Sequence, residues 1–184
     1  MGEIRKTEPV KLFISLLTSL PEMLPRVERD LISRYGTVDI RGGPFPFDKT
    51  HYYDEAMGVP LSRTILGFAE LVGPARLAGI KREMNAQEAR IAAEAGRIQR
   101  PVNLDPGYLE TSKVVLASTK NFYHRVFVGD DIFAEVTMHW QGGAWQKFDW
   151  TFPDFRSGQY DAFFTALRRA YRDQLRKLRE PGRT

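Results

Sequence analysis

Polar side chains that can move protons or hold anions gather in one stretch of the chain, from Val102 to Trp140. The stretch contains carboxylates, histidines, an amide and basic side chains, namely Asn103, Asp105, Lys120, His124, Arg125, Asp130, Glu135 and His139. A histidine beside a carboxylate can transfer protons near neutral pH, while lysine and arginine bind phosphate or carboxylate groups. The stretch therefore predicts a site in which His124, Glu135 and Asp105 act as catalytic groups.

The position of Glu135 relative to His124 depends on the register of a hairpin predicted around Gly129–Asp131. A loop of residues 129–130 places Glu135 opposite His124, and a loop of residues 129–131 places it opposite Arg125. A loop of residues 130–131 places Glu135 opposite Val126, with His124 on the diagonal. Every register gives Glu135 a basic neighbour. The contact is either an ordinary cross-strand charge pair, which we favour, or a carboxylate that tunes an imidazole in a cleft.

Further polar and aromatic residues complete the predicted site as ligand-binding groups. The segment Gly42–Gly58 is rich in aromatic residues, proline and glycine, and we expect a long loop that covers the site or packs on a sheet edge. We expect Asp154 or Ser157 to cap the following helix; the alternative is that Asp154 and Arg156 reach the same cleft as Asp105. The predicted ligand-binding residues are Asn103, Tyr108, Lys120, Arg125, Tyr52, Tyr53, Asp154 and Arg156.

Several kinds of site are excluded or disfavoured by what the sequence lacks. The chain has no cysteine, which excludes disulfides, thiolate nucleophiles and cysteine-ligated zinc or iron–sulfur centres. It also lacks the glycine-rich phosphate loops and the motifs of zinc proteases and serine hydrolases. The three histidines, His51, His124 and His139, are far apart in sequence, so we expect no metal site. No particular cofactor is indicated.

Apolar periodicity predicts the elements that must position these residues. Residues 105–107, Asp-Pro-Gly, are typical of a turn. A helix begins either at a capping box on Ser19 or at Pro25, and it ends at Gly36. A second helix begins at Pro74 and ends at Gly96, and a third covers about 158–179. Strands are predicted at 10–17, 38–41, 64–72, 113–117, 123–128, 132–140 and 144–150.

The order of these elements predicts an α+β fold. Two consecutive β-α-β units favour a ferredoxin-like split βαβ core, which an antiparallel β meander extends and a C-terminal amphipathic helix completes. The strongly apolar runs Val10–Leu17 and Thr64–Val72 should be neighbouring interior strands, covered on at least one face by the two earlier helices. The 184 residues suit a single domain, 1–184, with frayed ends at 1–8 and 180–184.

The net charge of +4 is concentrated in the last part of the chain. Residues 160–184 hold seven basic and three acidic side chains, while the remainder is balanced at twenty of each sign. A basic helix next to an aromatic-rich sheet is compatible with RNA binding, although a solvated surface helix gives the same pattern. No apolar run approaches the roughly 20 residues of a membrane helix, so we expect no membrane partner.

Six ordered segments carry a resemblance to a known family. They are VKLF at 10–13, PFPFDKTHYYD at 44–54, NLDPGYL at 103–109, K-VLA-T-K within 113–120, HRVFVGDDIFAE at 124–135 and WTFPDFR at 150–156. With them the chain resembles the bacterial domain of unknown function 4416 family over nearly its whole length. The resemblance implies a soluble, cytoplasmic bacterial protein and brings no activity with it.

Three classes of function remain after this reading of the residues. The first is a small-molecule site that binds or processes a phosphorylated or nucleotide-like ligand, with enzymatic activity left open. The second is a module that binds RNA or another anionic partner through the basic C-terminal helix. The third is a structural or assembly protein without a ligand. We rank them in this order, and the sequence leaves the oligomeric state open.

Overall fold

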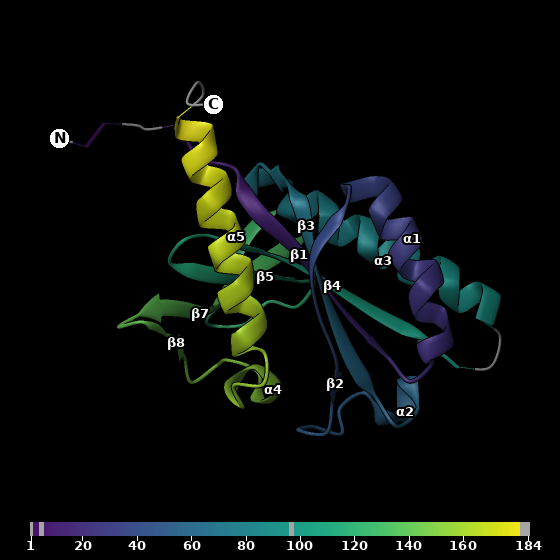
Figure 1. The fold of residues 1–184 in the computed structure, drawn as a ribbon. Coiled ribbons are helices and arrows are strands. Elements are labelled where there is room, and N and C mark those ends of the chain that lie inside the picture. Colours follow the sequence, from purple (N-terminus) through teal and green to yellow (C-terminus); the bar gives the residue numbers. More distant parts are fainter. Residues whose placement is uncertain (1, 4–5, 96–97, 181–184) are drawn as a thin grey trace.

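The computed structural model describes residues 2–3, 6–95 and 98–180. These residues form an α+β fold in which helices cover both faces of one antiparallel eight-stranded sheet (Figure 1). The predicted α+β class is therefore confirmed. The predicted helix end at Gly96 lies outside the described residues, as does part of each terminus predicted to be frayed.

The sheet has the strand order β2-β3-β1-β4-β5-β7-β6, and β8 also pairs with β7. The runs predicted to be neighbouring interior strands are β1 and β3, which pair side by side, so that prediction is confirmed. The strands are β1 (Val10–Thr18), β2 (Val38–Pro46), β3 (Ser62–Val72), β4 (Val102–Leu109), β5 (Lys113–Ser118), β6 (Val126–Gly129), β7 (Ile132–Gln141) and β8 (Ala144–Lys147).

The helices begin near the predicted prolines. Short 3-10 turns, Pro21–Met23 and Pro74–Arg76, lead into the first and third α-helices, because proline fits a first helical turn. The predicted capping box on Ser19 is wrong: its Oγ donates to the carbonyl oxygen of Met57, 2.5 Å away. The α-helices are α1 (Leu24–Tyr35), α2 (Asp54–Met57), α3 (Leu77–Ala95), α4 (Pro153–Arg156) and α5 (Asp161–Arg179).

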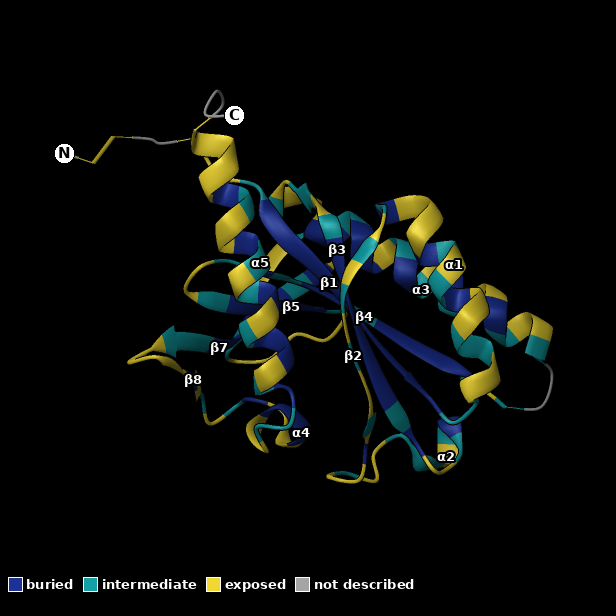
Figure 2. Ribbon diagram, viewed as in Figure 1, coloured by how far each residue is buried: buried dark blue, intermediate teal, exposed yellow. Residues whose placement is uncertain are grey.

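Two apolar clusters hold these helices on opposite faces of the sheet. Helices α1 and α3 pack on one face against β1, β3 and β4, and α5 packs on the other face against Phe13 and Ile65. Figure 2 shows that β1, β3 and β4 are mostly buried, while buried and exposed residues alternate along α5. The predicted apolar stripe of α5 is buried except for Leu178, which is 57% exposed near the helix end.

The long loop predicted at Gly42–Gly58 is shorter than expected. Strand β2 continues to Pro46 and pairs with β3, and α2 occupies the end of the segment. The register shifts between Gly42 and Phe45, and this irregularity accommodates Pro44 on an edge strand, where a missing N–H is tolerated. Residues 47–53 therefore form the irregular part of the segment.

The turn predicted at Asp105-Pro106-Gly107 is wrong, because these residues lie inside β4. Strand β1 pairs with the whole length of β4 on one side. On the other side β5 pairs with β4 only from Gly107, opposite Leu116, to Leu109. Beyond that point β4 and β5 separate, and Figure 1 shows the two strands diverging.

Pro106 accounts for the place where the β4–β5 ladder stops. Tyr108 pairs with Val115, and continuing that register places Pro106 opposite Ala117. Residues 104, 106 and 108 present their peptide groups to the same edge of β4, but Pro106 has no N–H to donate. The ladder therefore loses its next hydrogen bond at this residue, and β5 can turn away.

At Leu104, side chains of helix α3 supply the hydrogen bonds that a neighbouring strand would otherwise provide. The backbone N–H of Leu104 donates to Glu88 Oε1 at 2.7 Å, and its carbonyl oxygen accepts from Lys81 Nζ at 3.0 Å. A buried peptide group without a partner costs about 1–3 kcal/mol, so these side chains make the open edge tolerable. The gap between β4 and β5 is thus a stable part of the fold.

We predict that Gly107→Ala destabilises the protein by about 1–3 kcal/mol, because an added Cβ would overpack the point where the strands meet. That Cβ would lie 2.4 Å from Phe13 Cζ and 2.5 Å from the Val115 carbonyl oxygen. Gly79→Ala is the matched control, since a Cβ there meets nothing within 4 Å and alanine favours a helix. Urea unfolding measures both; equal stability of the two variants would contradict the prediction.

Candidate functional site

A cavity of about 390 Å³ lies where β4 and β5 separate. Its walls come from β4, the end of β5 with the following loop, α3, residues 47–53 and residues 152–155. The structure brings eight of the predicted site residues to this cavity. They are Tyr52, Tyr53, Asn103, Asp105, Lys120, Arg125, Glu135 and Asp154.

Three predicted site residues lie elsewhere in the described structure. The His124 ring stacks on Trp150, with 5.5 Å between the ring centroids, and its side chain is only 8% exposed behind Glu135. Tyr108 packs against an apolar cluster around Val115. Arg156 is exposed and donates to the carbonyl oxygen of Asp149. The cavity therefore does not support the prediction that these three side chains contact a ligand directly.

The hairpin register combines two of the three predicted alternatives. Asp130 and Asp131 form the loop, with φ of 51° and 57° as a two-residue turn of this kind requires. A bulge between Phe127 and Gly129 then shifts the pairing by one residue. Val126 consequently faces Ala134, and the same register places Arg125 beside Glu135.

The Glu135 carboxylate contacts both of its predicted basic neighbours, Arg125 and His124. Its Oε2 lies 2.8 Å from Arg125 Nε and 3.1 Å from His124 Nε2, and the residue is 3% exposed. Arg125 also donates to Ser118 Oγ and to the Lys120 carbonyl oxygen, each at 2.9 Å. Arg125 therefore fixes the loop that follows β5 and has fewer donors left for a ligand than the sequence suggested.

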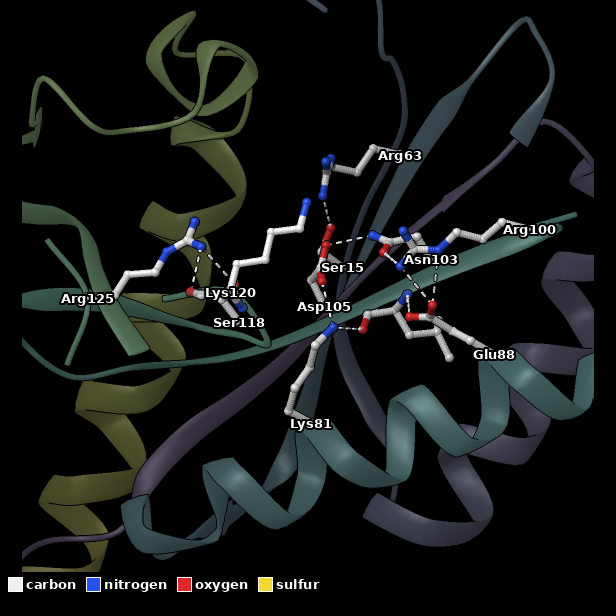
Figure 3. A network of polar contacts seen from close by, with 11 residues as sticks. Ser15, Arg63, Lys81, Glu88, Arg100, Asn103, Asp105, Ser118, Lys120 and Arg125 are labelled. Atoms are coloured by element: carbon white, nitrogen blue, oxygen red, sulfur yellow. Dashed lines mark hydrogen bonds and ion pairs between the residues drawn. The ribbon is translucent and has the colours of Figure 1, made fainter. Parts of the chain in front are cut away.

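Asp105 stands at the floor of the cavity in a polar network (Figure 3). Its Oδ1 accepts from Lys81 Nζ at 2.8 Å, and its Oδ2 accepts from Asn103 Nδ2 at 2.6 Å. Burial opposes ionisation, but the charges of Lys81 and Arg63 and the Asn103 hydrogen bond lower the pKa of Asp105 overall. The side chain keeps 28% exposure, so the ionised carboxylate faces the cavity.

The Asp105 network continues outward to Arg100, which donates to Asn103 Oδ1. Arg100 also donates to Glu88 Oε2 at 2.8 Å. Burial raises the pKa of Glu88, although Lys81 and Arg100 oppose this shift. The network thus ties α3 to β4 and to the loop before it.

Arg63 forms a second buried cluster at the cavity wall. Its Nη1 donates to Ser15 Oγ, and its Nε lies 3.1 Å from Asp154 Oδ2 in an ion pair without an aligned hydrogen bond. Tyr160 donates to the same Asp154 oxygen at 2.9 Å. Asp154 therefore does not cap a helix, and Phe152 and Tyr160 occupy the N-cap positions of α4 and α5. Asp154 lies in the lining of the same cavity as Asp105, whereas Arg156 does not.

Lys120 is the exposed cation at the cavity mouth. Its Nζ contacts the Tyr52 hydroxyl and lies 4.6 Å from the centre of the Tyr52 ring. That hydrogen bond lowers the pKa of Tyr52. No carboxylate of the described chain pairs with Lys120, whereas Lys81 and Arg63 each face one. In Figure 3 its side chain extends towards Arg63.

Among the residues of the site that sequence reasoning missed are four charged ones, Arg63, Lys81, Glu88 and Arg100, and the amide of Asn85. A signal for two of them was present in α3. Lys81 and Glu88 fall at helical spacing with the apolar residues of the buried face, namely Leu77, Met84 and Ile91. Charged residues on the buried face of a helix need partners, so they point to a polar site beneath it.

We predict that Asp105→Asn lowers the free energy of unfolding by about 3–5 kcal/mol at pH 7, because Lys81 loses its buried counter-charge. The lowered pKa of Asp105 makes this contribution complete above about pH 4 and lost as the pH falls through the folded-state value. The difference between wild type and variant in urea unfolding should therefore shrink as the pH falls below about 4.

The control for this pH series is Asp131→Asn at the exposed hairpin turn, where asparagine also adopts positive φ. This variant should match the wild type at every pH. A constant difference for Asp105→Asn across the series would show that the ionised carboxylate does not stabilise the fold.

These features define an α+β protein whose antiparallel sheet opens around a charged cavity. Residues 8–171 match the family model described as "Domain of unknown function (DUF4416)", so the chain belongs to that family, and the resemblance is confirmed. No curated protein and no solved structure matched the chain. Within the described residues, no helix combines the length and apolar character needed to cross a bilayer.

Proposed function

We propose that the protein binds a small anionic ligand, phosphorylated or nucleotide-like, in the cavity between β4 and β5. The observation that carries this proposal is the charge of the lining. Five cationic side chains and three carboxylates line the cavity: Arg63, Lys81, Arg100, Lys120 and Arg125 against Asp105, Glu135 and Asp154. Glu88, which pairs with Arg100, adds a fourth carboxylate and leaves one cation in excess. The walls therefore carry an excess positive charge that an anion would balance.

Lys120 is the main anion-binding group in this proposal. The other four cations already contact carboxylates, whereas Lys120 contacts only a tyrosine hydroxyl and ring among the described residues. An ammonium group donates three hydrogen bonds, and its bonds to phosphate are charge-assisted. A phosphate at the mouth would thus neutralise the positive charge of Lys120.

The size and aromatic content of the cavity support the same class of ligand. A volume of about 390 Å³ lies within the range of small-molecule sites, roughly 300–1,000 Å³. Phe47, Tyr52, Tyr53 and Phe152 line it and offer faces on which a planar group can stack. These rings come from the segments on either side of the mouth.

Proton transfer by His124 and Glu135 remains a prediction. Glu135 lines the cavity, but His124 lies behind it, and Arg125 shares the same carboxylate oxygen. This arrangement supports a structural charge cluster at least as well as catalysis. Ligand binding is accordingly the function that we propose, and enzymatic turnover is not part of the proposal.

We predict that Lys120→Met weakens the binding of inorganic phosphate and AMP by about 10-fold or more, because one charge-assisted contact is lost. Lys49→Met is the matched control: Lys49 is 45% exposed, pairs with the adjacent Asp48 and lies outside the cavity lining. Calorimetry and ligand-induced shifts of the melting temperature measure both variants. The proposal fails if neither anion binds the wild type, or if both variants bind like it.

We also propose that β2-β3-β1-β4, with α1 and α3, form the ferredoxin-like split βαβ core expected from the sequence. Support comes from the antiparallel pairing of β1 with both β3 and β4, from β2 at the edge of β3, and from the two helices on one face. The bacterial origin and cytoplasmic location rest on the family resemblance and stay predictions.

A second candidate function, binding of RNA or another anionic partner, is favoured by a groove of about 680 Å³ along α5. Five arginines line it, and the Arg168 guanidinium lies 4.4 Å from the centre of the Trp140 ring. Arg168 also donates to the Thr111 carbonyl oxygen at 2.6 Å, so part of this basic surface has a structural role. We rank RNA binding at α5 below the binding of a small anion in the cavity. The five arginines of the groove are Arg168, Arg169, Arg172, Arg176 and Arg179.

For this candidate we predict that replacing Arg169 and Arg172 with Gln leaves the melting temperature within about 2 °C, since surface substitutions change stability little. Any RNA affinity should fall, and the slope of log K against log salt should decrease by about 1–2 for single-stranded RNA. Arg26→Gln with Arg34→Gln on α1 is the matched control. An unchanged salt slope in the α5 variant would remove this candidate.

A further inference from the structure

The cavity has two chemically different ends. Lys120, at the mouth, presents an exposed ammonium group that no carboxylate of the described chain neutralises. Asp105, on the floor, presents a carboxylate whose charge Lys81 already balances at 2.8 Å. One end is therefore suited to an anion, and the other is suited to a neutral donor.

The Asp105 carboxylate has acceptor capacity left for a ligand. Each of its oxygens receives one recorded hydrogen bond, from Lys81 and from Asn103, and a carboxylate oxygen can accept about two. Its 28% exposure lies where the cavity reaches it. A hydroxyl group is the neutral donor best matched to such an oxygen.

Other polar groups at the floor fit hydroxyls as well. Asn85 lines the cavity from α3, and no hydrogen bond of its side chain is recorded within the described residues. Tyr53 also lines it, and burial together with the charge of Asp105 raises the pKa of Tyr53 to about 12, so its hydroxyl stays neutral. Amide and phenol groups both donate and accept, as hydroxyl-rich ligands require.

The charges around Asp105 argue against the two other ligand groups. An ammonium group would meet Lys81 and Arg63, whose positive charges already act on Asp105. A second anionic group would meet Asp105 itself and Asp154, which also lines the cavity. A neutral hydroxyl avoids both repulsions and keeps the hydrogen bond to the carboxylate.

The topology places the two ends on opposite walls. Gly107 and Leu116 are the last paired residues of β4 and β5, and Asp105 precedes Gly107 by two positions in β4. Lys120 follows Leu116 by four positions, on the loop after β5. A single small molecule that bridges the gap can therefore contact both residues, and Figure 3 shows Lys120 and Asp105 facing the same space.

Building on the proposed anion site, we infer that the ligand is a small phosphate ester with several hydroxyl groups, of the polyol phosphate or sugar phosphate class. Its phosphate contacts Lys120 at the mouth. Its hydroxyls donate to Asp105 and exchange hydrogen bonds with Asn85 on the floor. The aromatic side chains beside Lys120 cover the carbon skeleton between the two ends.

The test compares four probes on the wild-type protein by calorimetry: ethyl phosphate, glycerol 3-phosphate, ribose 5-phosphate and phosphoethanolamine. We expect glycerol 3-phosphate and ribose 5-phosphate to bind about 10-fold or more tightly than ethyl phosphate, because a hydroxyl bonded to a charged acceptor is worth about that factor. Phosphoethanolamine should bind no more tightly than ethyl phosphate.

Variants locate the effect. In Asn85→Ala, which removes a half-buried side chain without a recorded partner, the advantage of the hydroxylated probes should fall while ethyl phosphate binding stays unchanged. Asp105→Asn should reduce further the difference in affinity between the hydroxylated probes and ethyl phosphate. Lys120→Met should weaken the binding of all four probes equally.

Each failure has a separate meaning. Equal binding of ethyl phosphate and the two hydroxylated esters overturns the hydroxyl inference and leaves the anion site intact. Tightest binding of phosphoethanolamine overturns it in favour of an ammonium subsite. Absence of binding by all four probes and by inorganic phosphate overturns the proposed function itself.

Discussion

The end of the β4–β5 ladder at Pro106 is the constraint on which the rest of the site depends. Because Pro106 has no N–H, β5 leaves β4 after one short run of pairs, and the peptide groups of Leu104 need other partners. Lys81 and Glu88 supply them from α3. The ammonium of Lys81 then requires a counter-charge, which Asp105 provides. The polar floor of the cavity is thus a consequence of an interrupted sheet.

The opposite wall is fixed by a different contact. Arg125 pairs with Glu135 on β7 and also donates to the loop after β5, so this loop stays on its own side of the gap. The bulge beside Gly129 sets the register that makes the pairing possible. With both walls held by satisfied pairs, Lys120 is left as the exposed cation between them. The fold therefore concentrates its uncompensated charge at the mouth of the cavity.

Long periodic segments were predictable from the sequence, because their burial pattern and their local propensity agree. Strands β1 and β3 and the helices α1, α3 and α5 belong to this group. Asp-Pro-Gly at 105–107 predicts a turn that the structure does not contain, because pairing with β1 overrides the local turn signal. A basic neighbour for Glu135 was predictable because every hairpin register provides one, but no single register predicted contacts with both His124 and Arg125. Lys81 was missed although its helical spacing places it on the buried face of α3.

The most direct measurement is a crystal structure of the protein grown with a saturating phosphate ester. We expect phosphate density between β4 and β5, within hydrogen-bonding distance of Lys120, while the strand ladder still ends at Gly107 and Leu116. Phosphate found only in the arginine groove of α5 would contradict this expectation. A β4–β5 ladder that continues through Leu104 and closes the gap would contradict the claim that Pro106 ends the ladder and opens the cavity.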